Sequence, residues 1–235
     1  MKIVKPTIIP MRAIITDGVY KFLEYCARTC YKSVSNDKLS SEDFIRKLIK
    51  SGHESVLEHY SVSFRIICDR GISHELVRHR LASYSQESTR YCNYAKEDIE
   101  FIKPSEIKEG TPTFALWEQS CKQAEATYNK LIACRIKAET ARSVLPHSLK
   151  TEIVMTANLR EWRHFLKLRY AGETGKPHPD MLQVSSYIFD FFKTYLPIIV
   201  EDIAEEKTEE KTEATNEPNS DWYISYGAWC RKEGI

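Results

Sequence analysis

The apolar residues of the first fifty positions recur at the spacing of an α-helix. One run predicts an amphipathic helix over residues 17 to about 32, and the next predicts a helix that Ser41 caps and Gly52 ends. The inner faces of the two are expected to carry Val19, Phe22, Leu23, Cys26 and Cys30 in the first helix, and Phe44, Ile45, Leu48 and Ile49 in the second. We expect both cysteines to be small buried apolar residues, not a reactive pair.

Three segments predict β-strands. Apolar and polar residues alternate over residues 60–68 and again over 149–156, as in strands with one buried face. A shorter run over 98–103 predicts another strand. After the first strand, Ser73 is placed to cap a short helix that ends near Arg80, and the serine-rich residues that follow are expected to form a loop.

Helical spacing returns in the second half of the chain. A long helix is predicted from about residue 113, one or two further turns end near Pro146, Asn158 caps the next helix, and the last begins after Pro179. The apolar stripe of the long helix consists of Phe114, Trp117, Cys121, Tyr128, Leu131 and Ile132. That of the helix capped by Asn158 consists of Trp162, Phe165 and Leu166. That of the last helix consists of Met181, Val184, Ile188, Phe192, Tyr195 and Ile199. Glu, Lys, Thr and Asn then dominate over about 205–220, and residues 221–230 are again aromatic. This composition predicts one domain over 1–204 and a charged linker with an aromatic tail over 205–235.

Composition excludes several classes of protein. No run approaches the roughly 20 apolar residues that cross a bilayer. Seven cysteines without a Cys-x-x-Cys pair argue against a disulfide framework and a zinc ribbon, so reduced thiols in the cytoplasm are expected. A formal net charge of +1 over 235 residues disfavours a broad nucleic-acid or membrane surface.

Charge is nevertheless concentrated over residues 78–90, which read Arg-His-Arg-Leu-Ala-Ser-Tyr-Ser-Gln-Glu-Ser-Thr-Arg. Guanidinium groups suit phosphates and carboxylates, and the serines add neutral donors. On a helix, Arg78 and Arg80 would diverge by about 200°, so the simplest use of both is to bind two anionic groups on opposite sides. The alternative is a solvated basic helix end.

Two further arginines stand in apolar surroundings. Arg169 follows Trp162, Phe165 and Leu166 at helical intervals, which puts it on the buried stripe, where it needs an internal carboxylate or a ligand as partner. Arg142 follows Glu139 by three residues, so it either pairs with this carboxylate or contacts a ligand.

Other common site types lack support. His53 and His59 are six residues apart, about 240° around a helix, so a shared metal is not expected and no metal ligands are assigned. No Gly-x-Ser-x-Gly elbow and no glycine-rich phosphate loop occur among the eight glycines. Any nucleotide must therefore be held by side chains and helix ends.

These residues resemble the flavin-dependent thymidylate synthases. The family signature Arg-His-Arg-x-x-Ser-x-x-x-x-Ser-x-Arg is filled at every fixed position by Arg78, His79, Arg80, Ser83, Ser88 and Arg90. Gly-His-Glu-Ser-Val-Leu-Glu-His over 52–59, Glu-x-x-Arg with Leu-Pro over 139–146, and Asn158-x-Arg160 leading to Arg169 follow in the family's order. The resemblance covers roughly residues 1–200.

The resemblance implies an α+β fold, with a central mostly antiparallel sheet flanked by long helices, in a single domain that assembles as a homotetramer. It also implies FAD bound where subunits meet, and the methylation of dUMP to dTMP. Methylenetetrahydrofolate would give the carbon, and NADPH the reducing equivalents through the flavin. Small molecules are thus the expected partners, with no nucleic acid and no membrane.

The same resemblance assigns roles by matched position. FAD would be lined by Ser55, Arg78, His79, Arg80, Gln86, Asn158, Arg160 and His164, with His53 near flavin and folate. The residues expected around dUMP are Glu75, Leu76, Val77, Arg78, Gln86, Glu87, Ser88, Thr89, Arg90, Arg142 and Arg169. Arg169 is the expected catalytic residue, polarising uracil, and Ser88 a substrate contact, not a nucleophile.

The chain departs from the family pattern at a few positions. Glu75, Gln86 and His164 stand where other members hold Gln, Glu and Asn, and the stretch after Arg169 differs from the commoner His-Ala-Gln-x-Glu-Ile-Arg. A different class of function, a nucleic-acid-binding module, would place Arg78, Arg80 and Arg90 on phosphates and stack bases on Tyr84 and Tyr91. Steep salt dependence of oligonucleotide binding would distinguish it.

Overall fold

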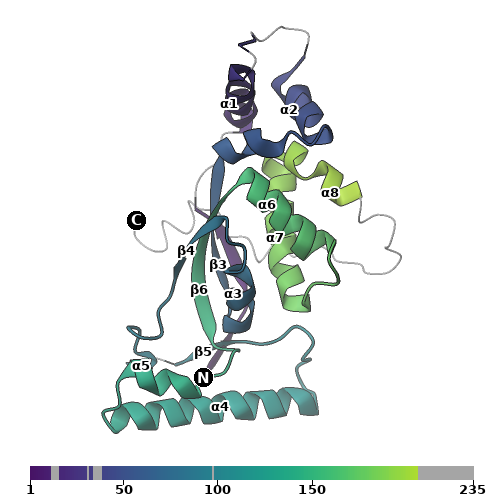
Figure 1. Ribbon diagram of the computed structural model, residues 1–235. Coiled ribbons are helices and arrows are strands. Elements are labelled where there is room, and N and C mark those ends of the chain that lie inside the picture. Colours follow the sequence, from purple (N-terminus) through teal and green to yellow (C-terminus); the bar gives the residue numbers. More distant parts are fainter. Residues whose placement is uncertain (12–15, 31, 34–38, 97, 206–235) are drawn as a thin grey trace. The chain divides into compact units, whose positions relative to one another are not determined.

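The structure, a computed structural model, describes residues 1–11, 16–30, 32–33, 39–96 and 98–205 (Figure 1). This part of the chain forms two compact units. Unit 1 contains residues 1–7, 65–80 and 84–154, and unit 2 contains residues 8–64, 81–83 and 155 onward. The predicted linker and aromatic tail lie, from residue 206 on, outside the described residues.

The N-terminal half alternates strands and helices. In chain order its elements are β1 (Lys2–Val4), β2 (Thr7–Pro10), α1 (Thr16–Thr29), α2 (Ser41–Lys50), η1 (Glu54–His59), β3 (Ser61–Asp69), α3 (Arg70–Leu76), β4 (Ala82–Gln86), η2 (Tyr94–Lys96) and β5 (Glu100–Ile102).

The C-terminal half is mainly helical. Its elements are α4 (Pro112–Ala133), α5 (Ala138–Ala141), η3 (Arg142–Val144), β6 (Lys150–Asn158), α6 (Leu159–Leu166), η4 (Lys167–Ala171), α7 (Pro179–Tyr195), η5 (Pro197–Ile199) and α8 (Glu201–Glu205). None of the described helices combines the length and the apolar composition that a membrane crossing needs.

The main sheet has the strand order β2-β3-β6-β4. Its central pair is antiparallel, because residues advance along β3 as their partners recede along β6: Leu159 N donates to the Tyr60 carbonyl (2.9 Å), Ser63 Oγ contacts Thr156 Oγ1 (2.7 Å), and Arg65 pairs with Glu152. Inward-facing residues alternate along both strands, as the sequence predicted. A separate pair, β1 and β5, is parallel.

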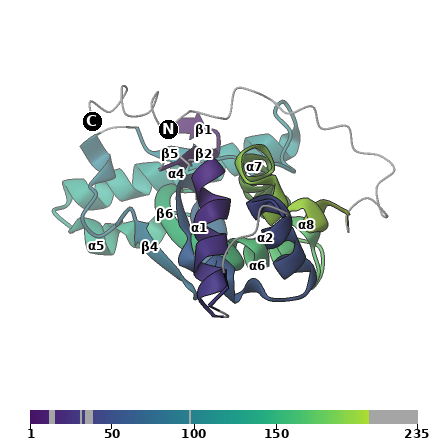
Figure 2. The ribbon, with the colours of Figure 1, turned by 90° about the horizontal axis from the view of Figure 1, so that it is seen from above.

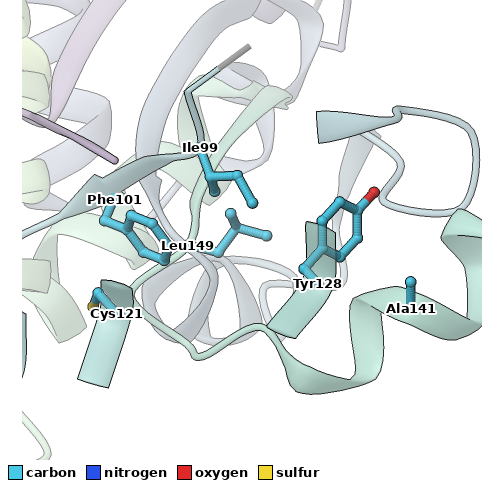
Figure 3. Close-up of a cluster of buried hydrophobic side chains, with 6 residues drawn as sticks. All are labelled: Ile99, Phe101, Cys121, Tyr128, Ala141 and Leu149. Carbon is cyan, nitrogen blue, oxygen red and sulfur yellow. The ribbon is translucent and has the colours of Figure 1, made fainter. Parts of the chain in front are cut away.

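Unit 1 has its core between α4, β5 and the start of β6. Phe101 and Leu149 point toward Cys121 and Tyr128 of α4, and Figure 3 shows these side chains together with the rest of the cluster, Ile99 and Ala141. The predicted apolar stripe of the long helix is therefore confirmed at Cys121 and Tyr128, its two buried positions. Thr111 caps this helix, its hydroxyl accepting from Phe114 N.

Unit 2 is built on aromatic packing around α6 and α7. The ring of Trp162 meets Phe64 edge to face at 5.1 Å, and its indole Nε1 donates to the Val62 carbonyl (3.0 Å). Asn158 caps α6 as predicted, since its side chain accepts from Glu161 N at 2.9 Å. Figure 2 shows α1 and α2 lying side by side in the same unit.

The structure corrects several predictions about the first ninety residues. Ser40, not Ser41, caps α2, and Asp69, not Ser73, caps α3. The inner face of α1 includes Tyr20, whereas Phe22 is 45% exposed. Cys26 is half-buried and Cys30, which follows the end of the helix, is exposed, so the expectation that both thiols are buried is wrong. The predicted loop after Arg80 contains strand β4, whose polar side chains hid it from a search for apolar alternation.

Candidate active site

The Arg-His-Arg triplet lies in a turn of unit 1 directly after α3, not within the helix. Arg78 N donates to the Glu75 carbonyl (3.2 Å) and His79 N to the Leu76 carbonyl (3.1 Å), which closes the turn. Arg78 and Arg80 are exposed, while His79 between them is only 5% exposed. Two permanent cations therefore flank one buried imidazole. Of the residues just before the triplet, Glu75 is half-buried, Leu76 buried and Val77 exposed.

Tyr84 fixes this turn from strand β4. Its hydroxyl lies 2.7 Å from the Leu76 carbonyl and 2.8 Å from the His79 carbonyl. Because the hydroxyl faces inward and the side chain is half-buried, Tyr84 does not offer the open stacking platform that the nucleic-acid hypothesis requires. Tyr91 is 80% exposed and lies under the guanidinium of Arg90, 5.4 Å from ring centroid to Cζ.

Hydrogen bonds anchor the segment over residues 86–90 at Gln86 and Glu87 and stabilise its turn at Ser88. The Gln86 amide Nε2 donates to Ser73 Oγ (2.9 Å) and Thr151 Oγ1 (3.2 Å), and Glu87 N donates to the Glu152 carbonyl (2.8 Å). Ser88 Oγ accepts from Arg90 N at 3.3 Å. The Gln86 amide is thus turned toward buried hydroxyls.

Arg142, the first residue of η3, contacts this segment at Thr89. Its Nη1 donates to Oγ1 of the buried Thr89 at 2.8 Å, and its Nε donates to the Glu139 backbone carbonyl at 3.2 Å. The Glu139 carboxylate instead lies 4.0 Å from Lys137, so the local Glu139–Arg142 ion pair is not the arrangement found. Unit 1 therefore brings Arg142 to Thr89, two residues that the resemblance assigned to one substrate.

A network of charged residues contacts this segment through Glu87. Lys150 Nζ lies 2.5 Å from Glu152, 3.5 Å from Glu100 and 3.7 Å from Glu87. Burial alone would raise the pKa of Glu152, but hydrogen bonds from Lys150 and Arg65 outweigh it, and the pKa is lowered. This network escaped the sequence analysis because Lys150 lies on a strand, far from the signature.

Glu87 is held within the same network. Tyr94 donates its hydroxyl proton to Glu87 Oε1 (2.8 Å), and burial together with this carboxylate raises the pKa of Tyr94. Oε2 of Glu87 is buried and has no hydrogen-bond partner among the described residues. The charge on Oε2 of Glu87 is therefore compensated by the ammonium group of Lys150, 3.7 Å away.

Unit 2 contains a cavity of about 650 Å³ beside α1, α2 and η1. Its lining includes two predicted site residues, His53 and Ser55, and four that the sequence analysis did not assign: Arg28, Cys30, Phe44 and Lys47. The guanidinium of Arg28 lies 4.5 Å above the Phe44 ring, and its Nε donates to Glu24 (2.6 Å), which in turn accepts from Ser41 (2.5 Å). The cavity thus combines an apolar wall with fixed positive charge.

The other predicted residues of unit 2 lie on and after α6. The Asn158 side chain is used as the cap, Arg160 is exposed and pairs with Glu58 at 2.6 Å, and His164 is exposed. Arg169 lies in η4, a π-helical turn that follows α6, and is half-buried. The expectation that Arg169 continues the buried α-helical stripe is therefore wrong, because the turn changes the periodicity after Leu166.

Arg163 is a fully buried arginine of unit 2, and the sequence analysis missed it. Its side chain is 1% exposed and contacts two carboxylates and one backbone carbonyl. The sequence signal for its burial was its position next to Trp162. Two adjacent residues of a helix are both buried when neighbouring elements cover more than one face of that helix, as they do for α6.

Comparisons with known proteins show which family this chain belongs to. The sequence model of one family, described as "Thymidylate synthase complementing protein", matches residues 15–198. A flavin-dependent thymidylate synthase of Geobacter sulfurreducens is 40% identical over 151 residues, which are 61% of this chain and 65% of that protein. One of Thermococcus kodakarensis is 44% identical over 131 residues, 54% of each chain. The chain thus spans about half to two thirds of the length of these curated relatives.

Solved structures share the fold. A UMP/dUMP methylase, PolB of Streptomyces cacaoi, bound with 5-Br dUMP, superposes with a TM-score of 0.74 at 23% identity, over 87% of this chain and 97% of that one. The resemblance that the signature indicated is confirmed: this chain belongs to the thymidylate synthase complementing protein family, whose members among its relatives are flavin-dependent thymidylate synthases.

Proposed function

We propose that this protein methylates dUMP to dTMP with methylenetetrahydrofolate as carbon donor and NADPH as reductant through FAD. The methylene carbon becomes the C5 methyl group of the pyrimidine, and NADPH supplies the two electrons that this step requires. The folate therefore leaves as tetrahydrofolate, and NADP⁺ is the other product.

The observation that carries the proposal is the arrangement around residues 78–90. Arg78, Arg80 and Arg90 are exposed, yet their backbone is fixed by Tyr84 and by the contact of Arg142 with Thr89. Cations held in this way are preorganised to bind phosphate, with little further loss of entropy. A solvated basic helix end would not need those internal contacts.

The residues present fit a flavin. The cavity with His53 and Ser55 offers Phe44 as an apolar surface and Arg28 and Lys47 as cations, which suits an aromatic ring system that carries phosphates. Arg78, Arg80, Gln86, Asn158, Arg160 and His164 are the further residues that we assign to FAD. When bound, the flavin supplies the hydride chemistry, and the protein supplies orientation and charge.

Arg169 is the residue to which we assign catalysis. A guanidinium beside the uracil carbonyl stabilises the enolate-like charge that develops when C5 attacks the donor carbon. The remaining residues that we assign to dUMP bind and orient it: Glu75, Leu76, Val77, Arg78, Gln86, Glu87, Ser88, Thr89, Arg90 and Arg142. No side chain is assigned as a covalent nucleophile.

We further propose a cytoplasmic homotetramer with FAD where subunits meet, His53 lying near flavin and folate. The six described cysteines are unpaired thiols, which supports a reducing compartment. Light scattering on the purified protein tests the assembly, with a mass of four chains of 27.3 kDa expected.

The activity is tested on purified protein. It should carry, or take up, a yellow flavin, oxidise NADPH faster with dUMP present, and form dTMP and tetrahydrofolate in equal amounts only when methylenetetrahydrofolate is added. Dihydrofolate as the folate product would contradict the proposed source of electrons. A colourless protein that FAD does not reconstitute would contradict the proposal as a whole.

A further inference from the structure

Arg163 connects three separate segments of unit 2. Its Nη2 donates to Glu54 of η1 (2.9 Å) and to Asp202 of α8 (2.6 Å), and its Nη1 donates to Asp202 (2.8 Å) and to the Ile199 carbonyl (2.5 Å). Figure 1 shows α6, which carries Arg163, beside α8. The planar guanidinium thus fixes the orientation of both carboxylates at once.

Both partners of this contact stay charged. Burial alone would lower the pKa of Arg163 and raise that of Asp202, yet the ion pair reverses both directions. An arginine that is 1% exposed needs such partners, because a buried guanidinium without a carboxylate is strongly destabilising.

Glu54 places this contact next to the cavity. It stands between His53 and Ser55, which both line the cavity, and its own carboxylate accepts hydrogen bonds from Arg163. The backbone of this turn is therefore held at the residue between the two that line the cavity.

We propose that Arg163 is a positioning residue, which fixes the turn that carries His53 and Ser55 by joining Glu54 to Asp202. The inference rests on the proposed function in so far as this turn binds the flavin. It assigns to α8, which lies far along the chain from the signature, a share in the affinity for the cofactor.

The chain offers a matched control one residue away. Glu201 precedes Asp202 in α8 and also pairs with an arginine, Arg46 of α2, at 2.7 Å. Both carboxylates are about one-third exposed, at 34% and 36%. Glu201→Gln thus removes an ion pair of the same helix that does not reach η1.

The test compares Asp202→Asn, Glu54→Gln and Glu201→Gln with the unmodified full-length protein. Arg163 itself is left in place, because its replacement would bury two carboxylates without a partner and risk misfolding. Titration of the apoprotein with FAD gives the Kd, thermal unfolding gives Tm, and hydrogen exchange of the amides over residues 53–59 reports on the turn.

We expect Asp202→Asn and Glu54→Gln to raise the Kd for FAD about tenfold and to accelerate exchange over 53–59. Glu201→Gln should lower Tm by a similar amount but leave the Kd and that exchange unchanged. Equal effects of Asp202→Asn and Glu201→Gln on the Kd would overturn the inference. So would a lower Tm of Asp202→Asn without a change in its Kd or in its exchange over 53–59.

The outcomes separate the two proposals. If the unmodified protein binds no FAD, the proposed function fails, and exchange over 53–59 still decides whether Asp202 holds the turn. If it binds FAD and Asp202→Asn changes neither affinity nor exchange, only the role of Arg163 fails.

Discussion

The guanidinium of Arg142 donates a 2.8 Å hydrogen bond to the hydroxyl of the buried Thr89. This bond joins the turn after α5 to the signature segment at Thr89, the residue directly before Arg90, the last arginine of the signature. The orientation of Arg142 is thereby set before any substrate arrives.

Removal of this acceptor should weaken substrate binding. Thr89→Val keeps the shape of the side chain but loses the oxygen, so Arg142 must be ordered by the substrate itself. We expect the KM for dUMP to rise about fivefold with little change in kcat, as the loss of a single hydrogen bond of roughly 1 kcal/mol implies. Thr89→Ser, which keeps the oxygen, should behave as the unmodified enzyme; a rise of equal size there would contradict this role.

Arg169 and Arg90 should differ in the kinetic constant that each controls. Arg169→Ala is expected to leave FAD bound, by its visible spectrum, while kcat for dTMP falls about 10²–10³-fold, because a charge that acts in the transition state is lost. Arg90→Ala should mainly raise the KM for dUMP, since it contributes ground-state binding. Unchanged turnover in Arg169→Ala would remove the proposed catalytic role.

The network of charged residues that contacts the signature segment through Glu87 predicts a pH dependence of stability. The pKa of Glu152 is lowered in the folded protein, so the stability it confers is complete above the ordinary carboxyl pKa and is lost as the pH falls through the folded value. Glu152→Gln should therefore lower the free energy of unfolding in urea by about 1–2 kcal/mol at pH 7 and by less at pH 3.

A surface pair serves as the control for this measurement. Glu118→Gln removes the ion pair with Lys122, a contact within α4 whose lysine is exposed, and should change stability by less than about 0.5 kcal/mol at either pH. A deficit of Glu152→Gln that is the same at pH 3 and pH 7 would show that packing, not charge, explains it.

Cysteine labelling can identify the cavity that binds the flavin. Cys30 is exposed and lines the cavity with His53 and Ser55, whereas Cys134 is exposed at the end of α4 in unit 1. Burial raises the pKa of Cys121 to about 11, so this thiol should stay unlabelled at neutral pH. We expect FAD to slow labelling of Cys30, followed by mass spectrometry of the peptides, and to leave Cys134 unaffected; equal labelling of Cys30 with and without FAD would place the flavin elsewhere.

Local chemistry explains which elements were predictable from the sequence. The alternation along β3 and β6 and the Asn158 cap of α6 depend on neighbouring residues only, and they are confirmed. Strand β4 was not predicted, because Ser83 and Ser85 are exposed on it and the alternation of apolar and polar residues along it is weak. Where two adjacent residues could both cap a helix, as Ser40 and Ser41 could, the choice depends on backbone angles that the sequence does not specify.

The two arginines after Trp162 show where periodicity fails. Extrapolation of the α-helical stripe placed Arg169 inside and left Arg163 unassigned. The π-helical turn η4 adds a residue per turn after Leu166, and η1 and α8 cover the face of α6 on which Arg163 lies. Both effects arise from tertiary packing, which lies outside any window along the chain.

The contacts of Arg163 also determine how short this protein can be made. The match to the family ends at residue 198, but the Ile199 carbonyl and the Asp202 carboxylate lie beyond it. Truncation at the family boundary would remove the Ile199 and Asp202 acceptors and leave Glu54 as the remaining anionic partner of Arg163, whereas a polypeptide that retains residues 199–205 preserves the full set of acceptors. Expression trials that stop at residue 198 should therefore yield insoluble material.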